Sequence, residues 1–344
     1  MKVLVSLFAV VPLPGDIPLP LPLPEWLLVF LLVVSFLLHI LFVNLMLGGT
    51  ILALWAEIKG LKEPGYDGLA REIAATITVN KSLAVVIGVA PLLVINALYT
   101  LYFYTANSLT GTMWIAIVPF VGTAFLLLYF HKYTWDRYRS KKAFHIFILA
   151  LALLVFLFVP LIFLTNINLM LFPEKWGTIR GFFSAMWLAN VIPRYLHFLC
   201  ASLAVSGLFL FGYMRRQRYP FTGRCPGLNR ARVLKNWYRL AFFASLLQLA
   251  FGPLNFFTLP WRAVTWGLAY IVLSGLVFAT GALILLYKEI NGPEGRLGRY
   301  FYAIALLLSI TVLFMGTGRH LYRAIALSAH QKKVLEKTGP YQAK

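Results

Sequence analysis

The sequence has 344 residues, of which 60% are hydrophobic, 16% aromatic and only 12% charged. Soluble domains carry about 25% charged residues, so this composition excludes an ordinary soluble protein and predicts an all-α polytopic membrane bundle. The net charge of +20 does not indicate nucleic-acid binding, because the basic residues lie in short blocks between long apolar runs, as membrane topology requires.

Residues 1–25 are expected to form an extracytoplasmic, proline-rich lead-in to the bundle. The apolar run over residues 3–13 is too short to span a bilayer. It can be the core of a cleaved signal sequence or a segment lying in the membrane interface, and we favour the interface. Residues 11–24 are rich in alternating proline, which forces extended or polyproline geometry rather than a helix.

Eight apolar segments follow, and they predict a transmembrane domain over residues 26–318. The predicted helices cover residues 26–56, 73–103, 112–131, 143–165, 186–214, 237–258, 264–287 and 300–318. Residues 319–344 form a basic C-terminal tail. This tail is interpreted as a solvated helix end or as a docking surface for an acidic partner, with the solvated end slightly favoured.

The basic residues divide the connecting loops into two classes. Loops 57–72, 132–142, 215–239 and 288–299 carry three, five, eight and three basic residues, which is 19 of the 31 in the chain. By the positive-inside rule these loops are cytoplasmic, in the inner membrane of a prokaryote. An even number of helices then places both termini on the extracytoplasmic side, where the six basic residues of the tail do not follow the rule.

Two histidines lie well inside the predicted helices. His39 is in a long uncharged stretch, and an imidazole in hydrocarbon is costly unless it is bound, so it is a functional residue by default. The alternative is a hydrogen bond to a carbonyl of a neighbouring helix. Gly48 and Gly49 on the same helix leave room for a neighbouring helix or a flat ring. His197 lies about eleven residues into the fifth helix, in the same outer half of the membrane.

The surroundings of these histidines favour a b-type haem. Arg194 lies one turn before His197, where a guanidinium can pair with a haem propionate while the imidazole binds iron; the alternative is snorkelling. Neither cysteine belongs to a Cys-x-x-Cys-His motif, so covalent attachment is not expected. The candidate iron ligands are His39, His197, Met315 and His320, and the candidates for propionate pairing are Arg194, Arg319 and Arg323.

The acidic residues are informative by their positions. All eleven lie outside the predicted helices or at their rims, as Glu57 does at the inner face. Transporters and pumps usually hold a carboxylate at depth, so a transporter is disfavoured. His131 and His145, which flank the loop after the third helix, are interpreted as interfacial histidines near lipid headgroups. Lys81 in the second helix can face a polar cavity, a quinone headgroup or a propionate.

Three short motifs resemble subunit I of the cytochrome bd-type quinol oxidases. The run His-Ile-Leu-Phe-Val-Asn-Leu-Met-Leu-Gly from His39 is similar to the haem-ligating run in the first helix of that family. Trp135-Asp136-Arg137 resembles a Trp-Asp-Arg motif after its third helix, and Arg194-Tyr195-Leu196-His197 resembles its fifth-helix haem-ligating run. The resemblance covers residues 26–214 and implies a helical bundle that holds haem b and acts on membrane quinol.

The sequence differs from this family at the residues and segments that serve oxygen reduction there. Its third predicted helix, residues 112–131, has no glutamate of the kind that delivers protons, and the basic segment 215–236 replaces the long quinol-binding loop. No counterpart of the glutamate that ligates a high-spin haem is evident, and Met315 is the one candidate for the methionine partner of the helix-five histidine. Oxygen is therefore not the expected acceptor.

Together these features predict a b-type cytochrome with two haems b near the outer face. It is expected to transfer electrons between membrane quinol and a periplasmic c-type cytochrome partner in a respiratory chain, within a hetero-oligomeric complex. His39 and His197 would each ligate one haem, and Met315 or His320 would supply the sixth ligand to the iron of one of these haems. The alternative is a haem-free, quinol-binding anchor subunit of an extracytoplasmic oxidoreductase.

Overall fold

A computed structural model describes residues 21–342, with the side chains of residues 77–82 and 337–342 outside the described part. Within that part the chain is helical and contains no strand, as the sequence predicts. The apolar run 3–13 and most of the proline-rich lead-in lie outside the described residues, and so does the side chain of Lys81.

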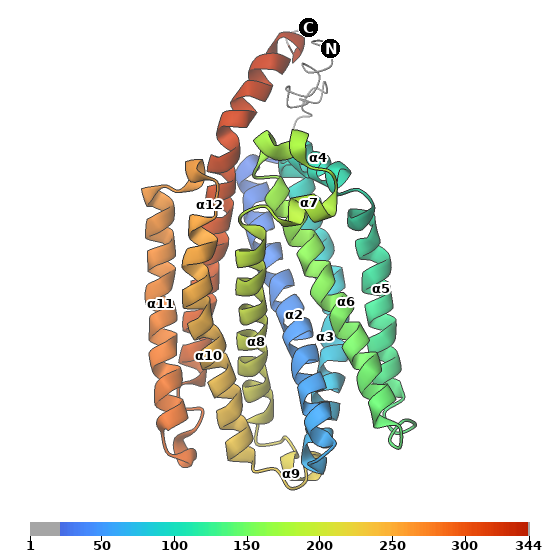
Figure 1. The fold of residues 1–344 in the computed structure, drawn as a ribbon. Helices are drawn as coiled ribbons and strands as arrows, with labels where there is room; N and C mark the ends of the chain where they lie inside the picture. The colour runs from blue at the N-terminus through green and yellow to red at the C-terminus, as the bar shows by residue number, and fades with distance from the viewer. Residues whose placement is uncertain (1–20, 343–344) are drawn as a thin grey trace.

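Long helices run side by side along one axis of the molecule (Figure 1). They are α2 (Glu25–Gly60), α3 (Pro64–Leu98), α5 (Thr112–Tyr133), α6 (Lys142–Leu169), α8 (Val191–Met214), α10 (Arg230–Phe257), α11 (Trp266–Asn291) and α12 (Phe301–Gln342). Short connecting helices are α4 (Thr100–Thr110), α7 (Phe182–Met186) and α9 (Phe221–Arg224), with 3₁₀ turns η1 (Pro173–Thr178), η2 (Trp261–Ala263) and η3 (Glu294–Arg296). Seven described helices are long and apolar enough to cross a membrane, and the bent pair formed by α3 and α4 makes up to eight. The protein is therefore a multi-pass membrane protein.

The second predicted helix differs most from the structure. α3 begins at Pro64, because proline is well tolerated in the first helical turn, and it ends at Leu98. At Tyr99 the backbone leaves the helical region, with φ −129° and ψ 38°, and α4 turns away by 111°. α4 consequently caps one end of the bundle (Figure 1) instead of continuing the span to residue 103.

The two ends of the bundle carry different segments. The loops 61–63, 134–141, 215–229 and 292–300 lie at one end, here called the basic-loop end. α2 begins and α12 finishes at the opposite, terminal end, beside α4 and α7 (Figure 1). α12 continues through residues 318 and 319 to Gln342, so Arg319 and Arg323 belong to the same helix as the last span and not to a separate coil.

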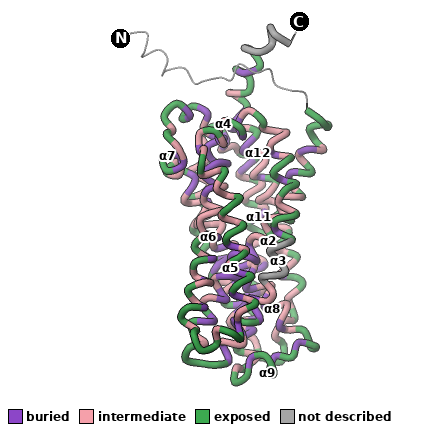
Figure 2. Tube along the Cα trace, turned by 90° about the vertical axis from the view of Figure 1, so that its right-hand side faces the viewer, coloured by how far each residue is buried: buried purple, intermediate pink, exposed green. Residues whose placement is uncertain are grey.

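Buried residues gather in two main cores along the bundle axis (Figure 2). The larger core lies toward the basic-loop end and includes Leu47, Phe211 and Tyr238. A smaller core lies at the terminal end, where α4 and the segment after α6 pack around Tyr102 and Trp176. The layer between these cores contains the two intramembrane histidines.

Gly48 allows α2 and α8 to touch below that layer. The Ser202 hydroxyl donates to Asn44 Oδ1 at 3.0 Å, and the Ser206 hydroxyl donates to the Asn44 carbonyl at 3.2 Å. A Cβ at Gly48 would lie 2.1 Å from the Ser202 carbonyl oxygen. A neighbouring helix, not a flat ring, therefore occupies the space beside Gly48.

We expect Gly48→Ala to destabilise the protein by about 1–3 kcal/mol, because the added methyl group forces two packed helices apart. Thermal unfolding in detergent measures this effect. Gly122→Ala is the matched control, since a Cβ there meets nothing within 4 Å. Equal unfolding midpoints for the two variants would contradict the close approach of α2 and α8.

Candidate functional site

His39 is held against α3. Its Nδ1–H donates to the Ala84 carbonyl at 2.9 Å, and a Cβ at Gly88 would lie 2.6 Å from His39 Cε1. The hydrogen bond to a neighbouring backbone, which the sequence left as an alternative, is thus present. Because Nδ1 carries the hydrogen, the lone pair of this imidazole is on Nε2. Proteins usually orient metal-binding histidines by a hydrogen bond of this kind from the other ring nitrogen.

His197 lies at the same depth on the neighbouring helix. α2 and α8 run in the same direction (Figure 1), and each histidine precedes the contact between Asn44 and Ser202 by five residues. Nδ1 of His197 is buried, and no described residue hydrogen-bonds to it. The protein therefore leaves this imidazole less satisfied than His39.

The layer around the two histidines is incompletely covered by protein side chains. No residue of α2 between Leu32 and Asn44 is buried, and none of α8 between Arg194 and Cys200 is buried. Interiors that consist only of protein are usually close-packed. A layer of this kind between two well-packed cores fits a bound group or lipid better than a continuous protein core.

Three arginines and a tyrosine meet just outward of this layer. We call Arg194, Arg319 and Arg323, with Tyr322 between them, the arginine cluster. Arg194 and Arg323 are only 7% and 4% exposed. The Arg194 guanidinium lies 5.4 Å from the Tyr322 ring centre, and that of Arg319 lies 4.3 Å from the Phe36 ring centre. The three arginines are close enough to interact with one another electrostatically.

The described part of the chain offers the arginine cluster no paired counter-ion. Both terminal nitrogens of Arg194 and the Nε atoms of Arg319 and Arg323 are buried and have no hydrogen-bond partner among the residues that the structure describes. Among the described residues, no salt bridge joins any of the three to a carboxylate. Because a buried unpaired charge is costly, two buried arginines beside a third that is partly buried point to an anionic ligand, and a pair of carboxylates suits the guanidinium geometry.

Met315 and His320, the other two candidate iron ligands, contact α11 and Tyr99 respectively. The methyl group of Met315 packs toward α11, where a Cβ at Gly275 would lie 2.7 Å from Met315 Cε. Nδ1 of His320 lies 3.5 Å from the hydroxyl of Tyr99, whose ring also stacks under Arg323 at 5.2 Å. His320 is therefore close to the arginine cluster, whereas Met315 faces a different helix.

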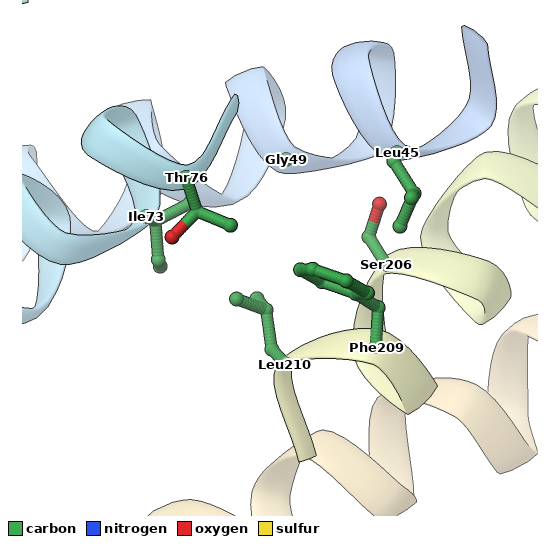
Figure 3. Close-up of a pocket in the computed structure, with 7 residues that line it drawn as sticks. All are labelled: Leu45, Gly49, Ile73, Thr76, Ser206, Phe209 and Leu210. Carbon is green, nitrogen blue, oxygen red and sulfur yellow. The ribbon is translucent and has the colours of Figure 1, made fainter. Parts of the chain in front are cut away.

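A small pocket lies between α2, α3 and α8, on the basic-loop side of the histidine layer (Figure 3). Its lining residues are Leu45, Gly49, Ile73, Thr76, Ser206, Phe209 and Leu210. Its cavity volume is only about 10 Å³, far below the roughly 300–1,000 Å³ of most ligand pockets. Gly49 therefore borders a packing defect and not a cofactor site.

A second cluster of ionisable groups lies near the basic-loop end, where Glu57, His131 and His145 meet from α2, α5 and α6. Nε2 of His131 donates to Glu57 Oε2 at 2.8 Å, and Nδ1 of His145 donates to Glu57 Oε1 at 2.5 Å. The three side chains are between 0% and 1% exposed. The interpretation of His131 and His145 as interfacial histidines is therefore wrong, because both rings are buried in the bundle.

Neighbouring groups hold this histidine–glutamate cluster in place. Nε2 of His145 donates to the His131 carbonyl at 2.8 Å, and the two rings stack with centroids 3.9 Å apart. Trp135 of the Trp-Asp-Arg motif packs edge-on against both rings. Lys142 bridges Glu57 Oε1 at 3.2 Å and Asp67 Oδ1 at 2.5 Å. In the sequence, His131 and His145 flank the short loop between α5 and α6, and this position could have indicated that the two rings meet. Nothing in the sequence indicates that they pair with Glu57.

Cys225, in the loop before α10, is fully buried. Burial, together with the negative charge of Glu72, raises the pKa of its thiol to about 11. We therefore expect slow alkylation of Cys225 at pH 7.5 in a Cys200→Ser background, because the thiolate is the reactive form. Mass spectrometry measures the label, and denatured protein is the control. Native labelling as fast as in the denatured chain would contradict this environment.

A comparison of the chain with protein-family models, curated proteins and solved structures finds no match. The functional argument therefore depends on the geometry described above and on the sequence motifs.

Proposed function

We propose that the protein is a membrane b-type cytochrome, a divergent relative of subunit I of the cytochrome bd-type oxidases, that passes electrons between membrane quinol and a periplasmic c-type cytochrome. The observation that carries this proposal is the arginine cluster. Each of its three arginines has a buried nitrogen without a partner among the described residues, and Arg194 lies one turn outward of His197 on α8. The two propionates of a haem would supply the missing anions.

The residues present fit such a group. His39 presents Nε2 because its Nδ1 donates to Ala84, and His197 keeps a buried nitrogen unpartnered. The two lie at one depth in the incompletely covered layer, so each can hold one of two haems, with His320 beside the arginine cluster. Haem b, when bound, supplies a one-electron carrier whose potential depends on its axial ligands and on burial.

The protein side chains would orient and hold these groups. The Ala84 carbonyl holds the His39 ring through their hydrogen bond, and the arginine cluster would bind the propionates of a haem. This end is the predicted periplasmic face, so a c-type cytochrome subunit would dock there. The described carboxylates of the spanning helices all lie near the helix ends. An oxygen-reducing enzyme needs groups that deliver protons within the membrane, so this distribution supports an electron carrier instead.

A second candidate is a haem-free, quinol-binding anchor subunit. The hydrogen bond from His39 to Ala84 favours it, because that bond already satisfies one nitrogen of the imidazole without iron. In that case a quinone headgroup or an anionic lipid would be the ligand of the arginine cluster.

An anaerobic electron-transfer assay tests the proposal. Purified protein in detergent is mixed with a reduced quinol analogue and an oxidised soluble c-type cytochrome. The expected result is protein-dependent reduction of the cytochrome, with no oxygen uptake when air is admitted. Quinol-driven oxygen consumption would contradict the assigned acceptor, and a complete lack of electron transfer would favour the anchor subunit.

A further inference from the structure

The histidine–glutamate cluster of Glu57, His131 and His145 is not used by the proposed electron transfer. It lies near the basic-loop end, inside the larger core, whose Trp135 packs against both rings. Its candidate donor atoms, one from each of three helices, all lie within 4.8 Å of one another. The three side chains are 0–1% exposed, and their hydrogen-bond partners lie within the bundle.

The hydrogen bonds show which atoms face the centre of the cluster. The His131 carbonyl can only accept, so Nε2 of His145 carries a hydrogen and its Nδ1 points at Glu57 Oε1. Nε2 of His131 points at the other oxygen of the same carboxylate. Two ring nitrogens and a carboxylate therefore converge, and protons shared along these two hydrogen bonds hold them together.

We propose that this cluster is a binding site for a divalent transition-metal ion, with Glu57, His131 and His145 as its ligands. Two imidazoles and one carboxylate form a donor set suited to Zn²⁺ or Fe²⁺ and unsuited to Ca²⁺. The bond from His145 Nε2 to a backbone carbonyl is the outer contact that ligating histidines usually make. The ion replaces the shared protons, as metal binding to histidine does generally.

The fit requires only small movements of side chains. Metal–ligand distances of about 2.0–2.2 Å place ligand atoms roughly 3.3 Å apart, compared with the present 2.5 and 2.8 Å between ring nitrogens and carboxylate oxygens. Lys142 opposes the ion because its ammonium lies 3.2 Å from Glu57 Oε1. Asp67 compensates this charge by binding the same ammonium, so the site with its neighbours keeps a low net charge.

Metal content tests the site independently of haem, since the probe is Zn²⁺. Full-length, tag-free protein is stripped with EDTA, incubated with Zn²⁺, desalted and analysed by mass spectrometry of the metal. We expect one retained zinc per chain, and a higher thermal midpoint with zinc. Glu57→Gln and His145→Ala should lose both effects, His330→Ala should keep them, and Ca²⁺ should not be retained.

Lys142→Met provides a variant that keeps all three ligands. Removing the nearby ammonium is expected to tighten Zn²⁺ binding about ten-fold. Failure of the unmodified protein to retain zinc, or equal retention by Glu57→Gln, would overturn the proposal and leave a cluster held together by protons alone. Unchanged or weaker zinc binding by Lys142→Met would place the ion elsewhere.

Discussion

Replacing His39 or His197 by alanine is expected to remove about half of the haem b from the purified protein. Each histidine lies in the same layer but on a different helix, and each would ligate its own haem. Loss of an axial imidazole removes the bond that holds the iron, whereas the second site keeps its ligands. The pyridine haemochrome assay, normalised to protein, measures the content of each variant.

His330→Ala is the matched control for these substitutions. This histidine lies on α12, beyond the arginine cluster, with its Nδ1 3.2 Å from the Tyr102 hydroxyl, and its loss should leave the haem content unchanged. The double variant, without His39 and His197, should contain almost no haem. Full haem content in both single variants would show that the ligand assignment is wrong.

Replacing Arg194 by leucine is expected to have opposite effects on the protein with and without haem. Without haem, the change removes a buried, unpaired charge, so the protein should become more stable by about 1 kcal/mol or more. With haem, it removes a charge-assisted hydrogen bond to a propionate, worth about 1.5–3 kcal/mol, and haem should bind roughly 10- to 100-fold more weakly.

Thermal unfolding of the haem-depleted protein and competition for haem by apomyoglobin measure these two quantities. Arg180→Leu is the control, because Arg180 is exposed in the segment before α7 at the same end of the bundle. Stabilisation without any change in haem retention would mean that Arg194 pairs with some other anion, such as a quinone or lipid headgroup.

Much of the fold follows from the sequence because apolar runs and charged loops alternate clearly. The first predicted helix, residues 26–56, corresponds to α2, and the fourth, residues 143–165, to α6. The prediction of a continuous helix to residue 103 is wrong, since α3 ends at Leu98. The sequence did not reveal this bend because no proline or glycine marks it at Tyr99. The last helix is longer than predicted: Arg319 and Arg323 resemble a helix end in the sequence, but both continue along α12.

In the candidate site, too, the sequence predicts local spacings but not contacts between distant helices. Arg194 was singled out because it lies one turn from His197, a local spacing that the helix preserves. That Arg194 meets Arg319 and Arg323 around Tyr322 depends on how α8 packs against α12, and no sequence pattern encodes this. Pairing of His131 and His145 with Glu57 likewise requires contacts between residues more than seventy positions apart.

The reduced-minus-oxidised absorption spectrum of the purified protein tests the central claim most directly. Because imidazoles at the depth of His39 and His197 are assigned to iron, we expect a Soret band, an alpha band that appears on dithionite reduction, and two haems b per chain. A protein that is produced with ample haem supply, folds, and shows neither band would contradict the assignment of these histidines and of the arginine cluster.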